Sequence, residues 1–233
     1  MSTAIAEGKT KLVFDVGKGR VLLVFKDTIT AGDGDRRDQM NGKGEINAKT
    51  SAILFSELTK GGVKNHFIEQ KDERSLVVRK LQMIPVEVVV RNIATGSIVK
   101  RLPIKEGHPF DPPLVEFFLK DDARHDPLLN YAHMEHLGLM RREEAIEVER
   151  LALAANEVLQ DFLDPKGLVL YDLKVEVGRD GSSLMLGDEL TLDSMRVRTK
   201  SNGEVLDKDL YRRGENLEVV KKAYVRFLEM VSN

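Results

Sequence analysis

The residues best suited to chemistry in this chain are charged side chains that stand at the ends of apolar segments. Arg91 and Ser97 enclose a small-residue turn that includes Gly96, and this turn follows the apolar run 83–90. The arginine supplies a rigid fork of donors, the glycine lets a ligand approach the backbone, and the serine adds a hydroxyl. The combination predicts an oxyanion site, although a surface arginine before an ordinary glycine turn has the same sequence.

A second group of charges alternates with apolar residues near position 174. Asp172, Lys174 and Glu176 are separated by single apolar residues, so they project from one face of a strand. Asp188 and Glu189 follow the apolar run 184–186, and a hairpin would bring these acids near Glu176. Carboxylates on adjacent strands beside a lysine suit Mg²⁺ that bridges nucleotide phosphates. A solvated strand edge would produce the same alternation, so both interpretations stay open.

Weaker signals of the same kind occur elsewhere in the chain. Gly8 can bring backbone amides close to a phosphate, and Lys9 and Lys11 alternate onto one face of a strand. Neither a P-loop nor a G-x-G-x-x-G sequence occurs. Further charged clusters lie at Lys120-Asp121-Asp122, His125-Asp126-Pro127, Asp193 to Arg196, and Lys208 to Arg212.

The elements that must position these residues follow from apolar periodicity and turn residues. Strands are expected at 9–16, 20–26, 65–69, 76–81, 86–91, 168–177 and 183–186, and helices at about 47–60, 141–162 and 217–231. The segment 100–130 contains five prolines between positions 103 and 127, which predicts irregular loops. Strands clustered before the long helices indicate an α+β fold whose first lobe is built on a largely antiparallel sheet.

Composition excludes several classes of protein. The 233 residues are 42% hydrophobic and 32% charged, with no cysteine, so disulfides and thiolate chemistry are ruled out. Thirty-six basic residues balance thirty-eight acidic ones, which argues against a nucleic-acid partner. No apolar run approaches the ~20 residues that span a membrane, and the N-terminus lacks a secretory signal. A cytoplasmic location without membrane association is expected.

Taken in order, the charged segments resemble the SAICAR synthetases, the phosphoribosylaminoimidazole-succinocarboxamide synthases of purine biosynthesis. The resemblance extends from Glu7 to Arg212. It is carried by Glu7 to Lys11, Phe25-Lys26-Asp27, Ala31 to Gly34, Gly42-Lys43-Gly44, Asn47, His66 to Ile68, Pro85-Val86-Glu87, Arg91 to Ser97, Glu116-Phe117, Lys120 to Asp122, His125 to Pro127, Asp172 to Gly178, Asp188-Glu189, Asp193, Arg196 and Lys208-Asp209.

The resemblance implies an enzyme, a carbon–nitrogen ligase. It would use ATP to condense L-aspartate with the carboxylate of carboxyaminoimidazole ribonucleotide (CAIR), giving SAICAR, ADP and phosphate. It also implies two lobes, a largely antiparallel N-terminal lobe at 1–84 and a larger α+β C-terminal lobe at 85–233, with ATP in the cleft between them. Bacterial relatives suggest a homodimer.

The resemblance assigns roles residue by residue. The ATP-binding set is Gly8, Lys9, Lys11, Met83, Lys120, Glu176 and Asp188, of which Glu176 and Asp188 would hold Mg²⁺. The substrate-binding set is Arg91, Ser97, Asp193, Arg196, Lys208 and Arg212. Lys120, Lys174 and Asp33 are the expected catalytic residues.

Some positions depart from the family pattern. Leu173 and Val177 stand where the family usually has phenylalanine, Thr191-Leu192 where it has Ser-Pro, and Arg198 where it commonly has tryptophan. The charged positions are intact. Two rival interpretations are a small-molecule kinase, which would stop after phosphoryl transfer, and a non-catalytic nucleotide-sensing module.

Overall fold

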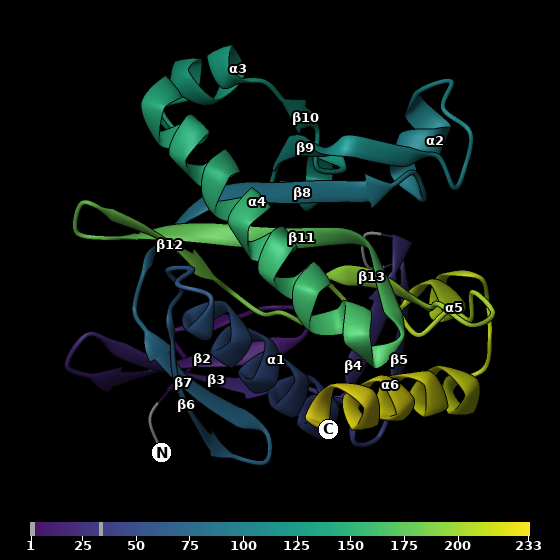
Figure 1. Ribbon diagram of the computed structural model, residues 1–233. Helices are drawn as coiled ribbons and strands as arrows, with labels where there is room; N and C mark the ends of the chain where they lie inside the picture. Colours follow the sequence, from purple (N-terminus) through teal and green to yellow (C-terminus); the bar gives the residue numbers. More distant parts are fainter. Residues whose placement is uncertain (1–2, 33–34) are drawn as a thin grey trace.

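Five strands within the first 79 residues form an antiparallel sheet in the order β1-β2-β3-β7-β6 (Figure 1). The computed structural model describes residues 3–32 and 35–233. The bounds are β1 Ala6–Glu7, β2 Lys11–Gly17, β3 Arg20–Phe25, β6 Phe67–Asp72 and β7 Ser75–Arg79. A separate ribbon pairs β4 (Thr28–Ala31) with β5 (Arg36–Gln39). The opening hairpin predicted from the sequence is confirmed.

Helix α1 (Lys43–Lys60) packs against this sheet and begins four residues before the predicted start at Asn47. The apolar pattern is weak at its start, because Lys43 and Asn47 are buried there by polar contacts with Asp193. The helix ends at Gly61, as predicted. A side chain there would meet Val158, since a Cβ at Gly61 would lie 2.5 Å from Cγ2 of that valine. Glycine therefore permits close packing between α1 and helix α4 (Arg142–Leu163).

A second antiparallel sheet contains the remaining strands. Its order is β10-β9-β8-β11-β12, and β13 pairs with the free half of β11. The bounds are β8 Gln82–Ile93, β9 Pro109–Leu119, β10 Leu128–Leu129, β11 Leu168–Asp180, β12 Ser183–Gly187 and β13 Met195–Thr199. Helix α4 lies across one face of this sheet (Figure 1) and buries Leu173, Val175 and Val177 beneath it. The polar residues of β11 are thereby turned to the opposite face.

Strand β9 corrects one prediction from the sequence. The segment 100–130 was expected to be irregular because of its prolines, yet eleven of its residues form a strand. Register with β8 breaks between Leu114 and Pro109, and β10 covers only Phe117 and Phe118. The prolines therefore lie where the strand has one neighbour and incomplete pairing, so few hydrogen bonds are lost.

Short helices complete the chain. They are α2 (Ser97–Arg101), α3 (Tyr131–His136) and α5 (Asp209–Arg212), followed by α6 (Leu217–Ser232), which lies beside α1 (Figure 1). The predicted helices at 141–162 and 217–231 are confirmed by α4 and α6. Within 3–32 and 35–233, no helix combines the length and apolar character needed to cross a membrane.

Candidate active site

Strands β8 and β11 carry three charged residues at the centre of the predicted site, Arg91, Lys174 and Glu176. In their antiparallel register Arg91 lies opposite Asp172, and Glu87 lies opposite Glu176. Lys174 stands between these two levels on the polar face of β11. The face away from α4 therefore presents a row of alternating charges, as the sequence predicted for Asp172, Lys174 and Glu176.

One end of this row lies in a cavity of 880 Å³ between the two sheets. Lys174 donates to Glu87 at 2.5 Å, and Lys120 donates to both carboxylate oxygens of Glu176 at 2.6 Å. On the other wall, Lys11 reaches Asp188 at 2.9 Å. The hairpin β11–β12 places Asp188 directly after Gly187, the residue paired with Glu176. Three carboxylates and three lysines thus converge in this cavity.

Electrostatics fix the protonation states in this cavity. Burial lowers the pKa of Lys11 and of Lys174, but the facing carboxylates outweigh burial, and both pKa values lie above the ordinary value. Burial and the charge of Asp188 raise the pKa of Glu176. Burial opposes ionisation of Asp188 too, yet Lys11, Lys120 and Lys174 hold its pKa below the usual range. Lys11 and Lys174 therefore stay charged near neutral pH and cannot serve as bases there.

Asp188 has an uncommon backbone conformation. Its φ is 63°, in the left-handed region that residues with a Cβ adopt at a cost of about 1 kcal/mol or more. His66 is buried beside it, and burial lowers the pKa of this histidine to about 4. The conformation turns the Asp188 carboxylate out of the β12 line toward Lys11. Strain of this kind is concentrated at functional sites.

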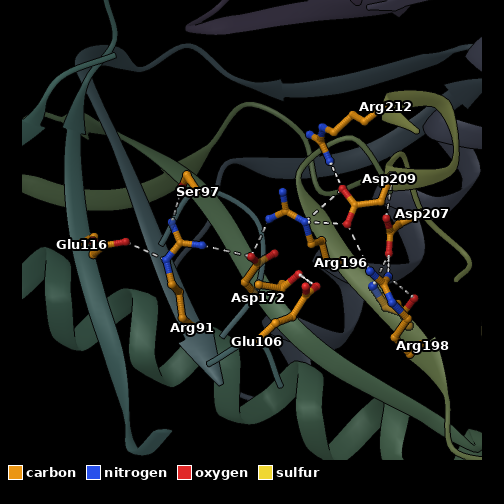
Figure 2. A network of polar contacts seen from close by, with 12 residues as sticks. Arg91, Ser97, Glu106, Glu116, Asp172, Arg196, Arg198, Asp207, Asp209 and Arg212 are labelled. Carbon is orange, nitrogen blue, oxygen red and sulfur yellow. Dashed lines mark hydrogen bonds and ion pairs between the residues drawn. The ribbon is translucent and has the colours of Figure 1, made fainter. Parts of the chain in front are cut away.

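The other end of the charge row opens into a smaller cavity of 390 Å³. Arg91 is only 2% exposed, and its guanidinium donates to Glu116 at 2.6 Å, Asp172 at 3.2 Å and Ser97 Oγ at 3.0 Å (Figure 2). The interaction with Ser97 joins the two ends of the predicted oxyanion turn. Arg91 is held rigidly before any ligand arrives.

Arg196 enters the same cavity from β13. It donates to Asp172 at 2.6 Å, and its Nε lies 2.9 Å and 3.1 Å from the two oxygens of Asp209 (Figure 2). A Cβ at Gly96 would lie 2.5 Å from Nη2 of Arg196, and Gly96 has a φ of 68°. Glycine is therefore required at position 96 both for its backbone angle and to admit the arginine. Arg212 completes the group, donating to Asp209 at 2.7 Å.

A third polar cluster lies where the two cavities meet. Asp193 lines both of them and forms a close ion pair with Lys43, which is fully buried at the start of α1. Tyr224 donates to Asp193 at 2.9 Å, and Nζ of Lys208 lies 3.7 Å from the same carboxylate. Burial lowers the pKa of Lys208 to about 8; Arg212 and Lys43 add to the shift, while Asp193 opposes it.

Not every predicted site residue lies in these cavities. Gly8, Lys9 and Lys11 line the larger one, where Lys9 lies 2.7 Å from Asp122. Met83 lines neither; its sulfur packs across two glycines of the β11–β12 hairpin, 3.1 Å from where a Cβ would stand on Gly178 or Gly187. Asp33 lies outside the described residues.

The structure adds polar residues that the sequence did not assign to the site. They are Glu87, Lys43, Arg101, Glu116, Asp207 and Asp209. A signal existed for Glu87, since it alternates within an apolar strand, and for Lys43, which sits between two glycines. Glu116 is one of the residues that carry the family resemblance, which assigned it no role. For Asp207 the sequence holds no signal, because its importance comes from its contact with Arg198, 9 positions away.

Two neighbouring cavities, both lined with cations and joined by one row of charges, are typical of an enzyme that acts on anionic substrates. The chain belongs to the SAICAR synthetase family, whose model matches residues 4–231.

Individual relatives agree with this membership. The chain is 58% identical over 229 residues to a phosphoribosylaminoimidazole-succinocarboxamide synthase of Sulfolobus acidocaldarius, covering 98% of this chain and 97% of that protein. It is 59% identical over 228 residues to the synthase of Sulfurisphaera tokodaii, with the same coverage. A solved SAICAR synthetase in complex with ADP is 39% identical and superposes with a TM-score of 0.92, over 97% of this chain and 96% of that one.

Proposed function

We propose that this enzyme condenses L-aspartate with the carboxylate of CAIR at the expense of ATP, releasing SAICAR, ADP and phosphate in purine biosynthesis. The observation that carries the proposal is the junction of the two cavities. Both are lined by Glu87, Lys174, Asp193 and Ser194, so a nucleotide in one and a ribonucleotide in the other would meet at these residues.

The chemistry explains why the substrates must meet. An amine does not displace oxide from a carboxylate at a useful rate, so the carboxylate needs a leaving group. Transfer of the γ-phosphoryl group forms an acyl phosphate; the amine of aspartate then attacks the carbonyl carbon, and phosphate leaves. Catalysis of such a transfer consists mainly of positioning and charge stabilisation.

The larger cavity is the proposed nucleotide site. Gly8, Lys9 and Lys11 would contact the ATP phosphates, and Lys120 and Lys174 would offset charge on the phosphoryl oxygens during transfer. The raised pKa of Lys174 supports this role, because a permanent cation stabilises an oxyanion and accepts no proton. The related synthetase solved with ADP supports a nucleotide here. Met83 would border the base from outside the phosphate region, and Asp33 keeps its proposed catalytic role.

Glu176 and Asp188 fit a Mg²⁺ ion. Their carboxylates come from adjacent strands into the nucleotide cavity, and Mg²⁺ commonly takes one or two carboxylates with phosphate oxygens completing its shell. In the described part of the chain no group of three acidic or histidine residues could hold a metal, which suits a site completed by the nucleotide. Bound there, the ion would neutralise charge on the transferring phosphate.

The smaller cavity is the proposed ribonucleotide site. Arg91, Ser97 and Arg196 would bind the phosphate of CAIR, since guanidinium forks match phosphate oxygens. Asp193, Lys208 and Arg212 would line the carboxylate end at the junction. Asp193 is an ion-pair partner of both Lys43 and Lys208, so its role is to orient these cations.

Three broader features belong to the same proposal. Residues 1–84 and 85–233 act as the two lobes that close on ATP, the enzyme is a homodimer, and it works in the cytoplasm. The separation of the sheets between Arg79 and Gln82 supports the two-lobe division.

A coupled assay for ADP release tests the proposal. Purified enzyme would be incubated with ATP, Mg²⁺ and CAIR, with and without L-aspartate. Sustained ADP release and SAICAR formation that both require aspartate are expected. Sustained ADP release without aspartate would identify a kinase, and no release under any condition would identify a sensing module. In a parallel mixture without aspartate, hydroxylamine should trap the acyl phosphate as a hydroxamate.

A further inference from the structure

Behind the phosphate-binding arginines lies a buried arginine that lines neither cavity. Arg198 is 6% exposed and stands two residues after Arg196 on β13, so both side chains leave the same face of the strand. Its guanidinium points toward the loop before α5, as Figure 2 shows. A buried arginine is costly unless every donor has a specific task.

The contacts of Arg198 connect it to two aspartates. It forms a close ion pair with Asp207 and donates to Oδ2 of Asp209 at 3.1 Å. Asp207 is fully buried, and its carboxylate also accepts the backbone amides of Val197 at 2.9 Å and Asp209 at 2.8 Å. Asp207 thus fastens the loop to β13, and Arg198 supplies the neutralising charge.

Asp209 is the link to the cavity. Its two oxygens bind Arg196, Arg198 and Arg212 together (Figure 2). Burial raises the pKa of Asp207. The charge of Arg198 opposes this shift, and the like charge of Asp209 adds to it. Without Arg198, Asp207 would keep its two backbone donors but lose the cation that pairs with it.

We propose that Arg198 is a positioning residue for the ribonucleotide phosphate: it neutralises Asp207 and Asp209, so that Asp209 orients Arg196 and Arg212 without cancelling their charge toward the cavity. The inference rests on the proposed assignment of the smaller cavity to CAIR. Arg198 itself lines neither cavity and would touch no substrate.

The net charge of the arginine–carboxylate network sets the expected loss of phosphate binding. The connected network holds five arginines (Arg91, Arg101, Arg196, Arg198 and Arg212) against four carboxylates (Glu116, Asp172, Asp207 and Asp209), which leaves one positive charge. Removing Arg198 would leave the network neutral. The phosphate dianion would then meet paired arginines with no excess charge.

Four variants test the inference. Arg198→Met removes the charge, and Arg198→Lys retains it. Arg198→Met combined with Asp207→Asn removes a positive and a negative charge together, which restores the excess. Arg226→Met is the matched control, because Arg226 pairs with Glu204 at 2.5 Å on the surface, away from both cavities.

Calorimetric titration would measure the dissociation constants of CAIR and of ADP separately, and steady-state assays would give kcat. Arg198→Met should weaken CAIR binding about tenfold, the scale of one lost charge in a partly buried phosphate site. ADP binding and kcat at saturating CAIR should change less than about twofold. Arg198→Lys and the double variant should bind CAIR within about threefold of wild type, even if their melting temperatures fall. Arg226→Met should match wild type.

The inference is overturned if Arg198→Met binds CAIR normally, or if CAIR and ADP binding weaken together. If that variant does not fold, the double variant decides, and CAIR binding lost tenfold in a folded double variant also overturns it. The binding measurements need no turnover. An enzyme inactive in the ADP-release assay would therefore refute the proposed reaction, and the effect of Arg198 on CAIR binding could still be measured.

Discussion

The activity of the enzyme should fall at alkaline pH because Lys208 loses its charge there. Burial lowers the pKa of its amine to about 8, and Asp193 offsets only part of that effect. The charged groups that face it are Asp193, Arg212, Lys43 and Glu189. With a pKa of about 8, roughly nine in ten Lys208 side chains are charged at pH 7 and roughly one in ten at pH 9.

The rate constant kcat/KM for CAIR reports ionisations of the free enzyme, so it should fall about tenfold per pH unit above 8. The aspartate amine titrates in the same range, and the ratio of wild type to Lys208→Arg at each pH removes its contribution. In Lys208→Arg the guanidinium stays charged, and the inflection near pH 8 should vanish.

Stability supplies an independent measurement of the same group. The pKa of Lys208 lies below its unfolded value of 10.5, so between pH 8 and 10.5 the unfolded chain holds a proton that the folded one has released. The free energy of unfolding should therefore rise with pH across this window, by about 3 kcal/mol from this group, and this rise should be absent in Lys208→Arg.

A constant ratio of the kcat/KM values of wild type and Lys208→Arg between pH 7 and 9.5 would refute the kinetic prediction.

Three further predictions concern other parts of the site. Glu176→Gln and Asp188→Asn should each lower kcat at least about 100-fold while the melting temperature shows a folded protein; near-normal turnover at limiting Mg²⁺ would exclude that residue as a ligand. Arg91→Lys keeps a charge but loses the fork, so calorimetry should show CAIR affinity weakened by about 1–3 kcal/mol with ATP affinity unchanged, and a loss confined to ATP would contradict the assignment. The pKa of His66 is lowered to about 4, and its Nε2 has no hydrogen-bond partner among the described residues. Because the unfolded chain binds a proton below pH 6.5, wild type should lose about 2 kcal/mol more stability than His66→Phe between pH 7.5 and 5.0 in urea titrations, and equal losses would refute the buried neutral state.

Elements with regular apolar spacing were predictable from the sequence, and α4, α6, the opening hairpin and the β11–β12 hairpin all follow it. The charged face of β11 was predictable for the same reason, since alternation fixes which side chains share a face. Strand β9 was not, because prolines disfavour strands except where pairing is incomplete, and pairing is a property of the tertiary structure.

The partners of the charged residues were also beyond the sequence. The segment Gly42-Lys43-Gly44 does not indicate that Lys43 is buried. It is fully buried because Asp193, 150 residues later, supplies its counter-charge. Glu189 contacts Thr10 across 179 residues in the same way. Local patterns indicate the face on which a charge lies, whereas only the assembled sheets determine which opposite charge it meets.

The pairing of β8 with β11 also limits how substrate preference can change. Glu176 lines the proposed nucleotide cavity and Asp172 the proposed ribonucleotide cavity, and the two residues lie four positions apart on one strand, a span of about 14 Å. A strand side can be lengthened only in steps of two residues, about 7 Å each, because a single insertion turns every following side chain to the other face. Selection for a shorter or longer ribonucleotide would therefore have to act on the flanking loops. Libraries aimed at new acceptor substrates should leave the two strands unchanged and vary the loop residues 125–127, which line the smaller cavity.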